Sequence, residues 1–408
     1  MIKSHVEIAF NIMKIGFLGN TNNFPFLIAQ AMKGMGHDVL FLINNPEALH
    51  RPEHRFHQFK NGYPDWIVDL SPYLRPKVTD QGRREVLRLL NGCDLAVLNG
   101  EGVGIGGHPG LKIPHVAVLT GSDLTDLARW QTVWAMNSQG APGSLRLLKL
   151  IKGLFQAWGM VRRQRQGIRN AVAYSYFPKG LLKADEALLK SIRPKGKRVC
   201  FALADTDNLP YVPPPNNMPL VLLNGARLSW KKPNSGPYTE LDYKGTDVLV
   251  KGLALYLKKH SEAAIRLKLV KKGRDVNATQ MLVNDLGIQD HVIWLEEMTQ
   301  QEILEAFKQA DIVAENMAMS APGMVTFDAM TLGRPVLVNA HPEFYGPAFG
   351  HPFPVGQTRT PEDVCRWLEK WVNNPKEREK AGMEARNYAL NHFAPGHAAE
   401  MLLKAVFS

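Results

Sequence analysis

The sequence contains little cysteine: Cys93, Cys200 and Cys365 are all that its 408 residues hold. An odd count without a C-x-x-C pair argues against a disulfide framework, and the lack of clustered histidines argues against a structural zinc site. No segment approaches the roughly 20 uncharged apolar residues of a membrane-spanning helix, and the first residues lack the apolar run of a signal peptide. We therefore expect a cytoplasmic protein in a reducing compartment.

Acidic residues are scarce in one part of the chain. Residues 141–198 hold 14 Lys+Arg against 2 Asp+Glu, a local excess of +12. The first half, residues 1–210, holds 27 Lys+Arg against 16 Asp+Glu, whereas residues 211–408 hold 22 of each. The net charge of +11 therefore arises entirely in the first half.

This basic segment includes "SLRLLKLIKGLFQAWGMVRRQRQGIRN" (Ser144–Asn170), with Trp158 towards its end. One helical face can be formed by Leu145, Leu147, Leu148, Leu150, Ile151, Leu154 and Phe155. Basic amphipathic helices bind anionic lipid surfaces, so one interpretation is a peripheral contact with the inner face of the membrane. The alternative is a core-facing helix with solvated cations. We expect no nucleic acid partner, because no recognised binding module accompanies the charge.

Short apolar runs alternate with helical stretches along the chain. "MKIGFLGN" (Met13–Asn20), "FPFLIAQAMKGMG" (Phe24–Gly36) and "HDVLFLIN" (His37–Asn44) are typical of a strand, a helix and a second strand. Further strands are expected at Cys93–Gly100, His115–Gly121, Leu220–Gly225, Ile265–Gly273, His291–Leu295, Ala310–Asn316 and Arg334–Asn339. This alternation predicts an α/β protein with parallel sheets covered by helices.

The chain is too long for one ordinary core, and two domains are the natural expectation. The stretch "DTDNLPYVPPPNNMP" (Asp205–Pro219) is rich in proline and asparagine and interrupts the alternation, which indicates a linker. We predict a first domain over residues 1–205, a linker over 206–218 and a second domain over 219–385. A helical segment over 386–408 is expected to pack back on the first domain.

The second domain places two cations after its predicted strands. Arg227 follows the first of these strands in "NGARLSW", and Lys244 begins a helix in "KGTDVLVKGLALYL". Ligands of open α/β sheets bind at the carboxyl ends of the strands, so both cations can converge on one anion. Further on, "SAPGMVTFDAM" (Ser320–Met330) places Gly323 and the next amides at a helix N-terminus, which suits phosphate oxygens.

These elements resemble the retaining glycosyltransferases of family 4, which have the GT-B fold. The resemblance is carried by "GARL", "KGTDVL", "ADIVAEN" and "FDAMTLGRPVLV", which follow the order of the family's motifs over Val221–Asn339. The first domain is more loosely similar through "GNTNNFPFLIAQAMKGMGHDV" and "VLTGSDL". The resemblance implies two Rossmann-like domains whose parallel sheets face each other across a cleft.

The resemblance also implies roles for particular residues. Arg227 and Lys244 match the family's cations that bind the donor diphosphate, and Asp328 matches an acid that binds the nucleotide ribose. The other matches to donor-binding positions are Gly19, Asn20, Gly323, Met324 and Val325. Fixed cations and helix amides stabilise the departing diphosphate without reorganising. The scheme needs no metal and no other cofactor, and no Asp-x-Asp pair stands where a metal-held diphosphate would need it.

The sequence departs from the family pattern at several positions. Ser320 stands where the first acid of an E-x7-E element is usual, and the second acid is shortened to Asp328. Thr120 replaces the histidine of "HGSDL", with Asp123 nearby, and we expect both to join Arg227 and Lys244 as catalytic residues. Ser320 is expected to face the donor sugar; the alternative is a helix N-cap. Glu315, on the "ADIVAEN" strand, is expected to be a neighbour of the site.

We therefore expect a glycosyltransferase that transfers a hexosyl or related sugar from a nucleotide sugar, with retention of configuration. The expected acceptor is a cell-envelope glycan or a lipid-linked glycan. Two alternatives stay open. A nucleotide-sugar epimerase on the same fold would need carboxylates facing the second carbon of the sugar, and a non-catalytic GT-B protein would bind a nucleotide or a partner without turnover.

Overall fold

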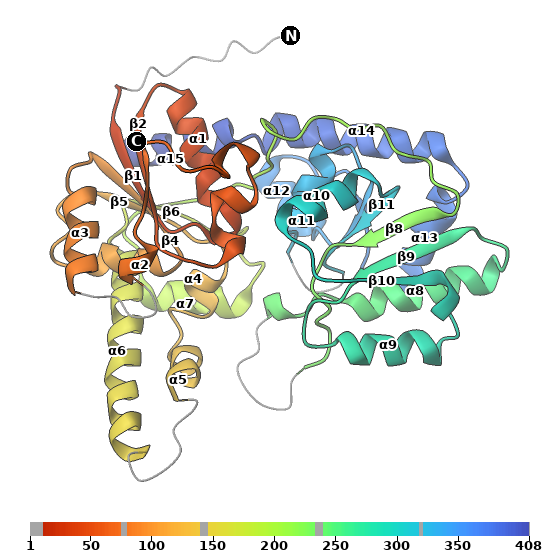
Figure 1. The fold of residues 1–408 in the computed structure, drawn as a ribbon, viewed down its shortest axis with the longest axis horizontal. Coiled ribbons are helices and arrows are strands. Elements are labelled where there is room, and N and C mark those ends of the chain that lie inside the picture. The colour runs from red at the N-terminus through yellow and green to blue at the C-terminus, as the bar shows by residue number, and fades with distance from the viewer. Residues whose placement is uncertain (1–10, 75–79, 139–145, 233–239, 318–320, 408) are drawn as a thin grey trace.

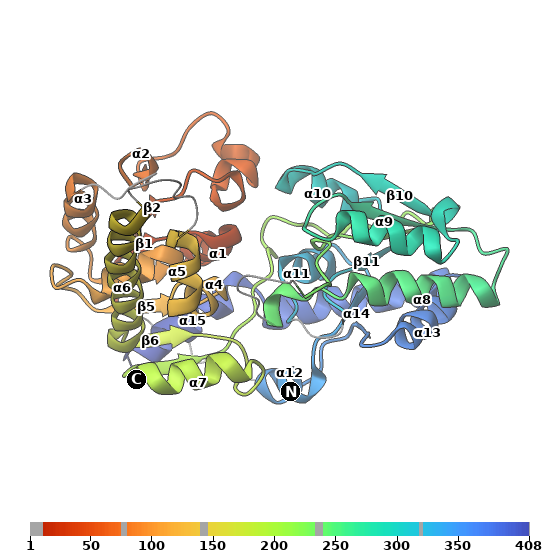
Figure 2. The ribbon, with the colours of Figure 1, turned by 90° about the horizontal axis from the view of Figure 1, so that it is seen from below.

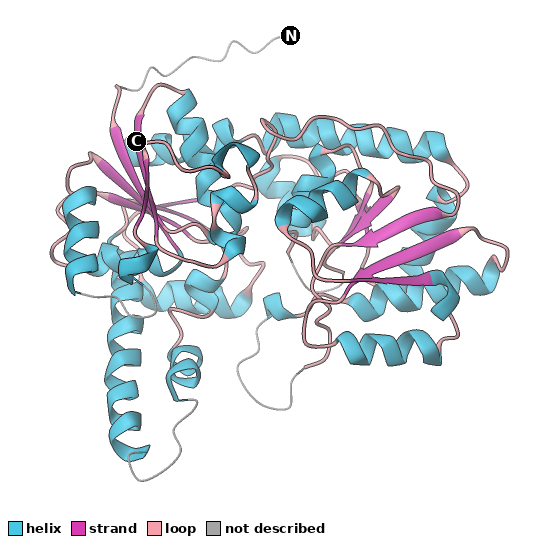
Figure 3. Ribbon diagram, viewed as in Figure 1, coloured by secondary structure: helices cyan, strands magenta, loops and turns pink. Residues whose placement is uncertain are grey.

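The computed structural model describes residues 11–74, 80–138, 146–232, 240–317 and 321–407. Within these residues the chain forms two domains side by side, each with a parallel β-sheet covered by helices (Figure 1 and Figure 3). The predicted α/β class with two Rossmann-like domains is confirmed.

The sheet of the first domain has seven strands in the described part of the chain, and all neighbours pair in parallel. Their order is β3 (Ile67–Asp69), β2 (Asp38–Ile43), β1 (Lys14–Leu18), β4 (Leu95–Asn99), β5 (His115–Val118), β6 (Ala173–Ser175) and β7 (Lys197–Val199). The helices of this domain are α1 (Phe24–Gly34), α2 (Ser71–Leu74), α3 (Asp80–Leu90), α4 (Ser122–Thr125), α5 (Trp130–Ser138), α6 (Arg146–Asn170) and α7 (Lys183–Ile192).

The second sheet has six parallel strands among the residues described. Their order is β10 (Val292–Leu295), β9 (Ile265–Val270), β8 (Leu220–Asn224), β11 (Ile312–Ala314), β12 (Val336–Val338) and β13 (Gly356–Gln357). Its helices are α8 (Thr246–Lys259), α9 (Val276–Asp285), α10 (Gln300–Lys308), α11 (Met324–Thr331), α12 (Pro342–Phe349), α13 (Pro361–Trp371) and α14 (Pro375–His392). The order changes direction at β8 and β11, and ligands of open α/β sheets bind at the carboxyl ends of strands at such a point.

Every strand expected from the sequence forms, within a few residues of its predicted bounds. The strands that the sequence did not predict are β3, β6, β7 and β13, each two or three residues long. Segments this short carry too few apolar positions for a periodic pattern, and they pair because neighbouring strands offer an edge.

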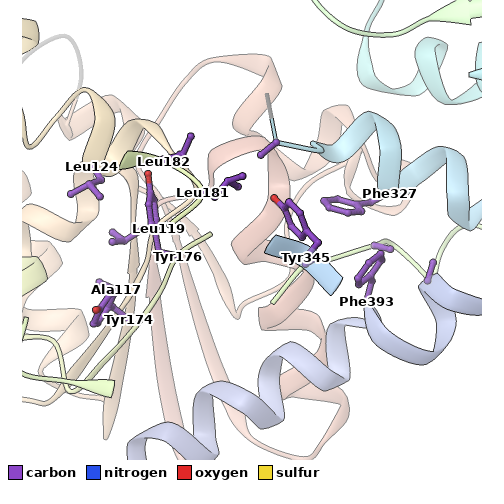
Figure 4. Close-up of a cluster of buried hydrophobic side chains, with 14 of the residues drawn as sticks. Ala117, Leu119, Leu124, Tyr174, Tyr176, Leu181, Leu182, Phe327, Tyr345 and Phe393 are labelled. Atoms are coloured by element: carbon purple, nitrogen blue, oxygen red, sulfur yellow. The ribbon is translucent and has the colours of Figure 1, made fainter. Parts of the chain in front are cut away.

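Apolar packing joins the two domains. One buried cluster continues from Tyr176 and Leu181 of the first domain to Phe327, Tyr345 and Phe393 of the second (Figure 4). The rings of Phe327 and Phe393 meet edge to face, with their centroids 5.2 Å apart. Aromatic pairs of this kind contribute about 0.5–1.5 kcal/mol beyond the area that they bury. This pair lies within the second domain, and the buried cluster that includes it continues into the first domain close to helix α11.

The end of the chain returns to the first domain. Helix α14 packs against α11 of the second domain, and α15 (Pro395–Phe407) packs against α1 (Figure 1). Helix α6 projects from the first domain (Figure 1), and α5 lies beside it in both views (Figure 1 and Figure 2). Among the described residues no helix is long and apolar enough to cross a bilayer.

Candidate active site

Arg227 lies in the loop that follows β8. The backbone N–H of Leu228 donates to the carbonyl of Lys272 at 2.7 Å, and Leu228 in turn accepts from the N–H of Asp275 at 3.0 Å. These bonds fix the loop to the one that follows β9. The side chain of Leu228 is buried while Arg227 is exposed, so the guanidinium is free to meet a ligand.

Lys244 is held between two loops of the same sheet edge. Its N–H donates to the carbonyl of Ser229 at 2.7 Å, and its carbonyl accepts from the N–H of Met317 at 2.9 Å. Burial lowers the pKa of Lys244 to about 8; Glu315 and Asp242 raise it, and the charge of Arg227 lowers it further. The structure therefore brings Arg227 and Lys244 within electrostatic reach of each other, and their convergence on one anion stays a prediction.

Helix α11 begins beside these cations. Gly323 is its N-cap, and Gly323, Met324 and Val325 are partly exposed, whereas the next residues of the helix are buried. Met324 also packs against the apolar core of the first domain. These three predicted donor-binding residues thus lie at the boundary between the domains. Ser320 lies outside the described residues, so its position facing the donor sugar stays a prediction.

Asp328, the predicted ribose ligand, lies in a buried ion cluster. Arg55 of the first domain donates to both of its carboxylate oxygens, at 3.0 and 2.8 Å, and also donates to Asp205 at 3.2 and 2.9 Å. The side chains of Arg55, Asp205 and Asp328 are 4%, 2% and 6% exposed. Burial raises the pKa of Asp328, and the charge of Arg55 opposes this effect. In this arrangement a ribose reaches Asp328 only if the cluster rearranges.

Gly19 and Asn20 form the loop after β1. Gly19 has a φ of 95°, and a Cβ there would collide with the carbonyl oxygen of Asn99, so only glycine fits. The Asn20 side chain is buried, and its amide donates to Asn23 at 2.7 Å and to the carbonyl of His50 at 2.9 Å. Asn20 thus shapes the loop, and its contact with a donor stays a prediction.

Thr120 and Asp123 lie together on the first domain. The Asp123 carboxylate is buried and accepts from the N–H of Thr120 at 2.6 Å, from its hydroxyl at 2.9 Å and from the N–H of Gly100. Burial raises the pKa of Asp123, and these bonds oppose the effect. Asp123 therefore fixes the loops around Thr120, which is itself partly exposed. The next residue, Gly121, faces Leu241 of the second domain, three residues before Lys244.

Sequence reasoning did not single out Asp126, which follows α4. Its carboxyl group is partly buried, and burial raises its pKa to about 6, with a further contribution from the charge of Asp242 across the domain boundary. A carboxyl group with this pKa can accept or release a proton near neutral pH. No sequence signal marks it, because its partner is distant in the chain.

The sequence does not mark Arg55, which contacts α11, and it indicates a smaller role for Glu315 than the structure shows. Arg55 carries no signal in "RPEHRFHQFK", because both of its partners are more than 100 residues away. Glu315 was expected to be only a neighbour of the site, yet its carboxylate accepts from the first turn of α11. An acid within the apolar run "ADIVAEN" is the signal that could have found it.

A metal centre has no candidate among the described residues, which contain no group of three or more His, Cys, Asp or Glu able to hold an ion. That donor binding needs no metal stays a prediction, because a metal could be held by the donor diphosphate itself.

Comparisons with known proteins agree with this geometry. Residues 240–388 match the family model of the group 1 glycosyl transferases. The fold matches Anabaena Alr3699/HepE in complex with UDP and glucose, with a TM-score of 0.58 at 14% identity over 96% of this chain and 98% of that chain. Sucrose-phosphate synthase from Thermosynechococcus elongatus matches with a TM-score of 0.57 at 12% identity, over 97% and 99% of the two chains.

A third solved structure is WaaG, a glycosyltransferase involved in lipopolysaccharide biosynthesis. It matches with a TM-score of 0.52 at 15% identity, over 95% of this chain and 99% of that chain. A sequence search of curated proteins finds no match. The fold is GT-B, and the second domain carries a group 1 glycosyl transferase domain. The chain is thus a glycosyltransferase, and membership of family 4 in particular stays a prediction.

Proposed function

We propose that the protein transfers a sugar from a nucleotide-sugar donor with retention of configuration. The observation that carries this proposal is the placement of Arg227, Lys244 and the start of α11 at one edge of the second sheet. Lys244 and α11 lie within residues 240–388, which match the group 1 glycosyl transferases. The similar fold of Alr3699/HepE, whose structure holds UDP and glucose, supports a nucleotide-sugar donor.

The proposed chemistry follows from the charges at the site. When the bond between the anomeric carbon and the diphosphate breaks, negative charge develops on the diphosphate oxygens. Lys244, which is largely shielded from water, and the exposed Arg227 stabilise that charge, and the interaction is stronger at Lys244 because electrostatic interactions strengthen away from water. The acceptor oxygen forms the new glycosidic bond while its proton passes to an oxygen of the departing diphosphate, and nucleoside diphosphate is released.

The proposed acceptor is a cell-envelope glycan or a lipid-linked glycan, reached at an anionic membrane surface. Helix α6 supports this, because its large apolar side chains are exposed at a spacing that places them on one face. These are Ile151, Leu154, Phe155 and Trp158, at 43%, 43%, 69% and 54% exposure. We call them the α6 stripe. The similar fold of WaaG, involved in lipopolysaccharide biosynthesis, points to the same class of acceptor.

Arginines continue the α6 stripe towards the body of the domain. Arg162 lies over the Trp158 ring, 5.1 Å from its centroid. Beside them is a groove of about 440 Å³ whose lining contains no acidic residue. It is lined by Trp130, Trp158, Val161, Arg162, Arg165, Gln166, Arg169, Ser191 and Ile192. Aromatic rings next to cations suit the boundary between acyl chains and anionic headgroups.

A thermal-shift screen against nucleoside diphosphates and nucleotide sugars tests the donor. A ligand at 100 times its Kd stabilises the folded state by about 2.7 kcal/mol, so the true donor raises the Tm. Product analysis then separates the alternatives that share this binding. Transfer gives a glycosylated acceptor and free nucleoside diphosphate, an epimerase gives an isomeric nucleotide sugar, and a non-catalytic protein leaves the ligand unchanged.

A further inference from the structure

Glu315 is a buried acid at the edge of the proposed donor site. It follows β11 directly and is 6% exposed. One carboxylate oxygen, Oε2, accepts the N–H of Gly323 at 2.8 Å and the hydroxyl of Thr326 at 2.5 Å. Gly323 is the N-cap of α11, and Thr326 is the third residue of the helix. The carboxylate therefore joins the end of the strand to the first turn of the helix.

This contact supplies a partner and a counter-charge to the helix start. The first N–H groups of an α-helix lack partners within the helix, and the positive end of the helix dipole favours a negative charge. The contact also explains Gly323, because a Cβ there would lie 2.5 Å from Oε1 of Glu315. In this chain the Glu315 carboxylate thus supplies a negative charge at the start of α11.

Lys244 lies next to the same carboxylate. Its carbonyl is bonded to the N–H of Met317, two residues after Glu315, and Gly245 packs tightly against the carbonyl of Met317. Burial raises the pKa of the Glu315 carboxyl group, and its bonds from Thr326 and Gly323 together with the charge of Lys244 oppose that effect. The described ion pairs include none between Glu315 and Lys244, so their side chains interact without direct contact. The other charged or titratable groups near the pair are Arg227 and Asp242 beside Lys244, and Tyr345 of α12 beside Glu315.

We propose that Glu315 is a positioning residue of the donor site, whose carboxylate fixes the first turn of α11 and supplies a negative charge near Lys244. The inference rests on the proposed function, since it assigns Glu315 a task only if Lys244 binds the donor. Glu315 is buried and acts through Gly323, Thr326 and Lys244 in this proposal. Because the Glu315 carboxylate is bonded to Gly323 and Thr326, Arg227 and Lys244 remain available to bind the diphosphate.

The test measures the pKa of Lys244 in the full-length protein without any ligand. Lysine labelled with ¹³C at Cε gives one signal per side chain, and the Lys244→Arg variant identifies the signal of Lys244. Glu315→Gln keeps a hydrogen-bond acceptor for the helix but removes the charge. We expect the pKa of Lys244 to fall by on the order of 1 unit, the size typical of losing a nearby opposite charge.

Thr326→Val is the matched control, because it removes a hydrogen bond to the same carboxylate and leaves the charge in place. We expect this variant to lower the Tm without moving the pKa of Lys244. If Glu315→Gln also lowers the Tm but leaves that pKa unchanged, Glu315 has only a structural role and the inference is wrong. If the Glu315→Gln protein does not fold, Glu315→Asp is the second variant, because it keeps the charge but has a shorter side chain. We expect Glu315→Asp to lower the Tm and to preserve the pKa of Lys244.

The pH dependence of nucleoside diphosphate binding separates this inference from the proposed function. If both hold, the pH at which affinity declines moves downward in Glu315→Gln together with the pKa of Lys244. If the pKa moves but no nucleoside diphosphate binds either protein, the proposed function fails and the electrostatic pairing stands. If the diphosphate binds with the same pH dependence in both proteins, the inference fails and the proposed function stands.

Discussion

Two cations at the edge of the second sheet carry the proposed chemistry at the residue scale. Replacing Arg227 or Lys244 with Ala removes a charge-assisted contact to the donor diphosphate, worth about 1.5–3 kcal/mol. We expect nucleoside diphosphate affinity, measured by calorimetry, to fall about tenfold or more in each variant. Lys258→Ala is the control, because Lys258 is an exposed lysine on α8, the helix that follows Lys244. Wild-type affinity in both site variants would refute the assignment.

The pKa of Lys244 predicts how binding depends on pH. Burial lowers this pKa to about 8, so the free protein loses the ammonium proton as the pH rises through that value. A bound diphosphate favours the charged form, and above pH 8 binding must therefore take up a proton. We expect affinity to be constant below about pH 7 and to fall up to about tenfold per pH unit above pH 8. Calorimetry in buffers of different ionisation enthalpy measures the proton uptake; no uptake at pH 8.5 would contradict the prediction.

Sequence spacing could predict the positions of Arg227, Lys244 and Gly323, because each follows a strand or begins a helix within a recognisable motif. It could not predict the partners of Asp328 or Asp123. Arg55 lies 273 residues from Asp328, and no local pattern records that contact. Asp123 was expected to be catalytic from its place in "VLTGSDL", whereas its carboxylate is committed to loop backbone. The catalytic role of Thr120 stays a prediction.

Helix α6 is the feature that matters most at the scale of elements. The sequence predicted a helix over Ser144–Asn170, and the structure has α6 over Arg146–Asn170. The core-facing interpretation holds for Ala157 and Val161, which are buried with Val133. The α6 stripe is exposed, and its contact with a membrane surface stays a prediction. The sequence could not separate the two faces, because the position of α5 decides which residues are covered.

The α6 stripe predicts binding to anionic liposomes. Phe155→Ser together with Trp158→Ser removes its two most exposed side chains, and Arg162→Ser with Arg165→Ser removes charge beside them. We expect co-sedimentation with anionic vesicles to fall in both double variants, and the charge effect to weaken with salt, since screening acts over about 10 Å at 0.1 M.

The control for this prediction is Met281→Ser, which removes a 65% exposed side chain from α9 of the second domain. It should leave liposome binding unchanged. If wild-type protein does not bind anionic vesicles, or if the α6 variants bind as well as Met281→Ser, the stripe has a different role.

At the scale of the whole molecule, Arg55 connects the two domains through Asp205 and Asp328. Arg55→Ala would leave two carboxylates buried without a counter-charge. Breaking a buried ion pair in this way costs about 3–5 kcal/mol. We expect a loss of this size in the free energy of unfolding, measured by urea denaturation with the domains monitored together.

Arg83→Ala is the matched control for this prediction, because Arg83 pairs with Asp80 in an exposed i,i+3 contact on α3. Such pairs contribute about 0–1 kcal/mol. If Arg55→Ala costs no more than Arg83→Ala, the cluster does not stabilise the domain arrangement that the structure shows. The alternation of strands and helices could predict two parallel sheets, but not this arrangement, which depends on single side chains from distant segments.

The central claim is that Arg227 and Lys244 hold a nucleotide-sugar donor for transfer. Its most direct test is the rate of nucleoside diphosphate release from a panel of nucleotide sugars, measured with and without glycan acceptors. We predict that at least one donor is turned over by the wild type, and that the rate falls on the order of 100-fold or more when both cations are replaced with Ala. No turnover of any nucleotide sugar, or wild-type turnover without the two cations, would contradict the claim.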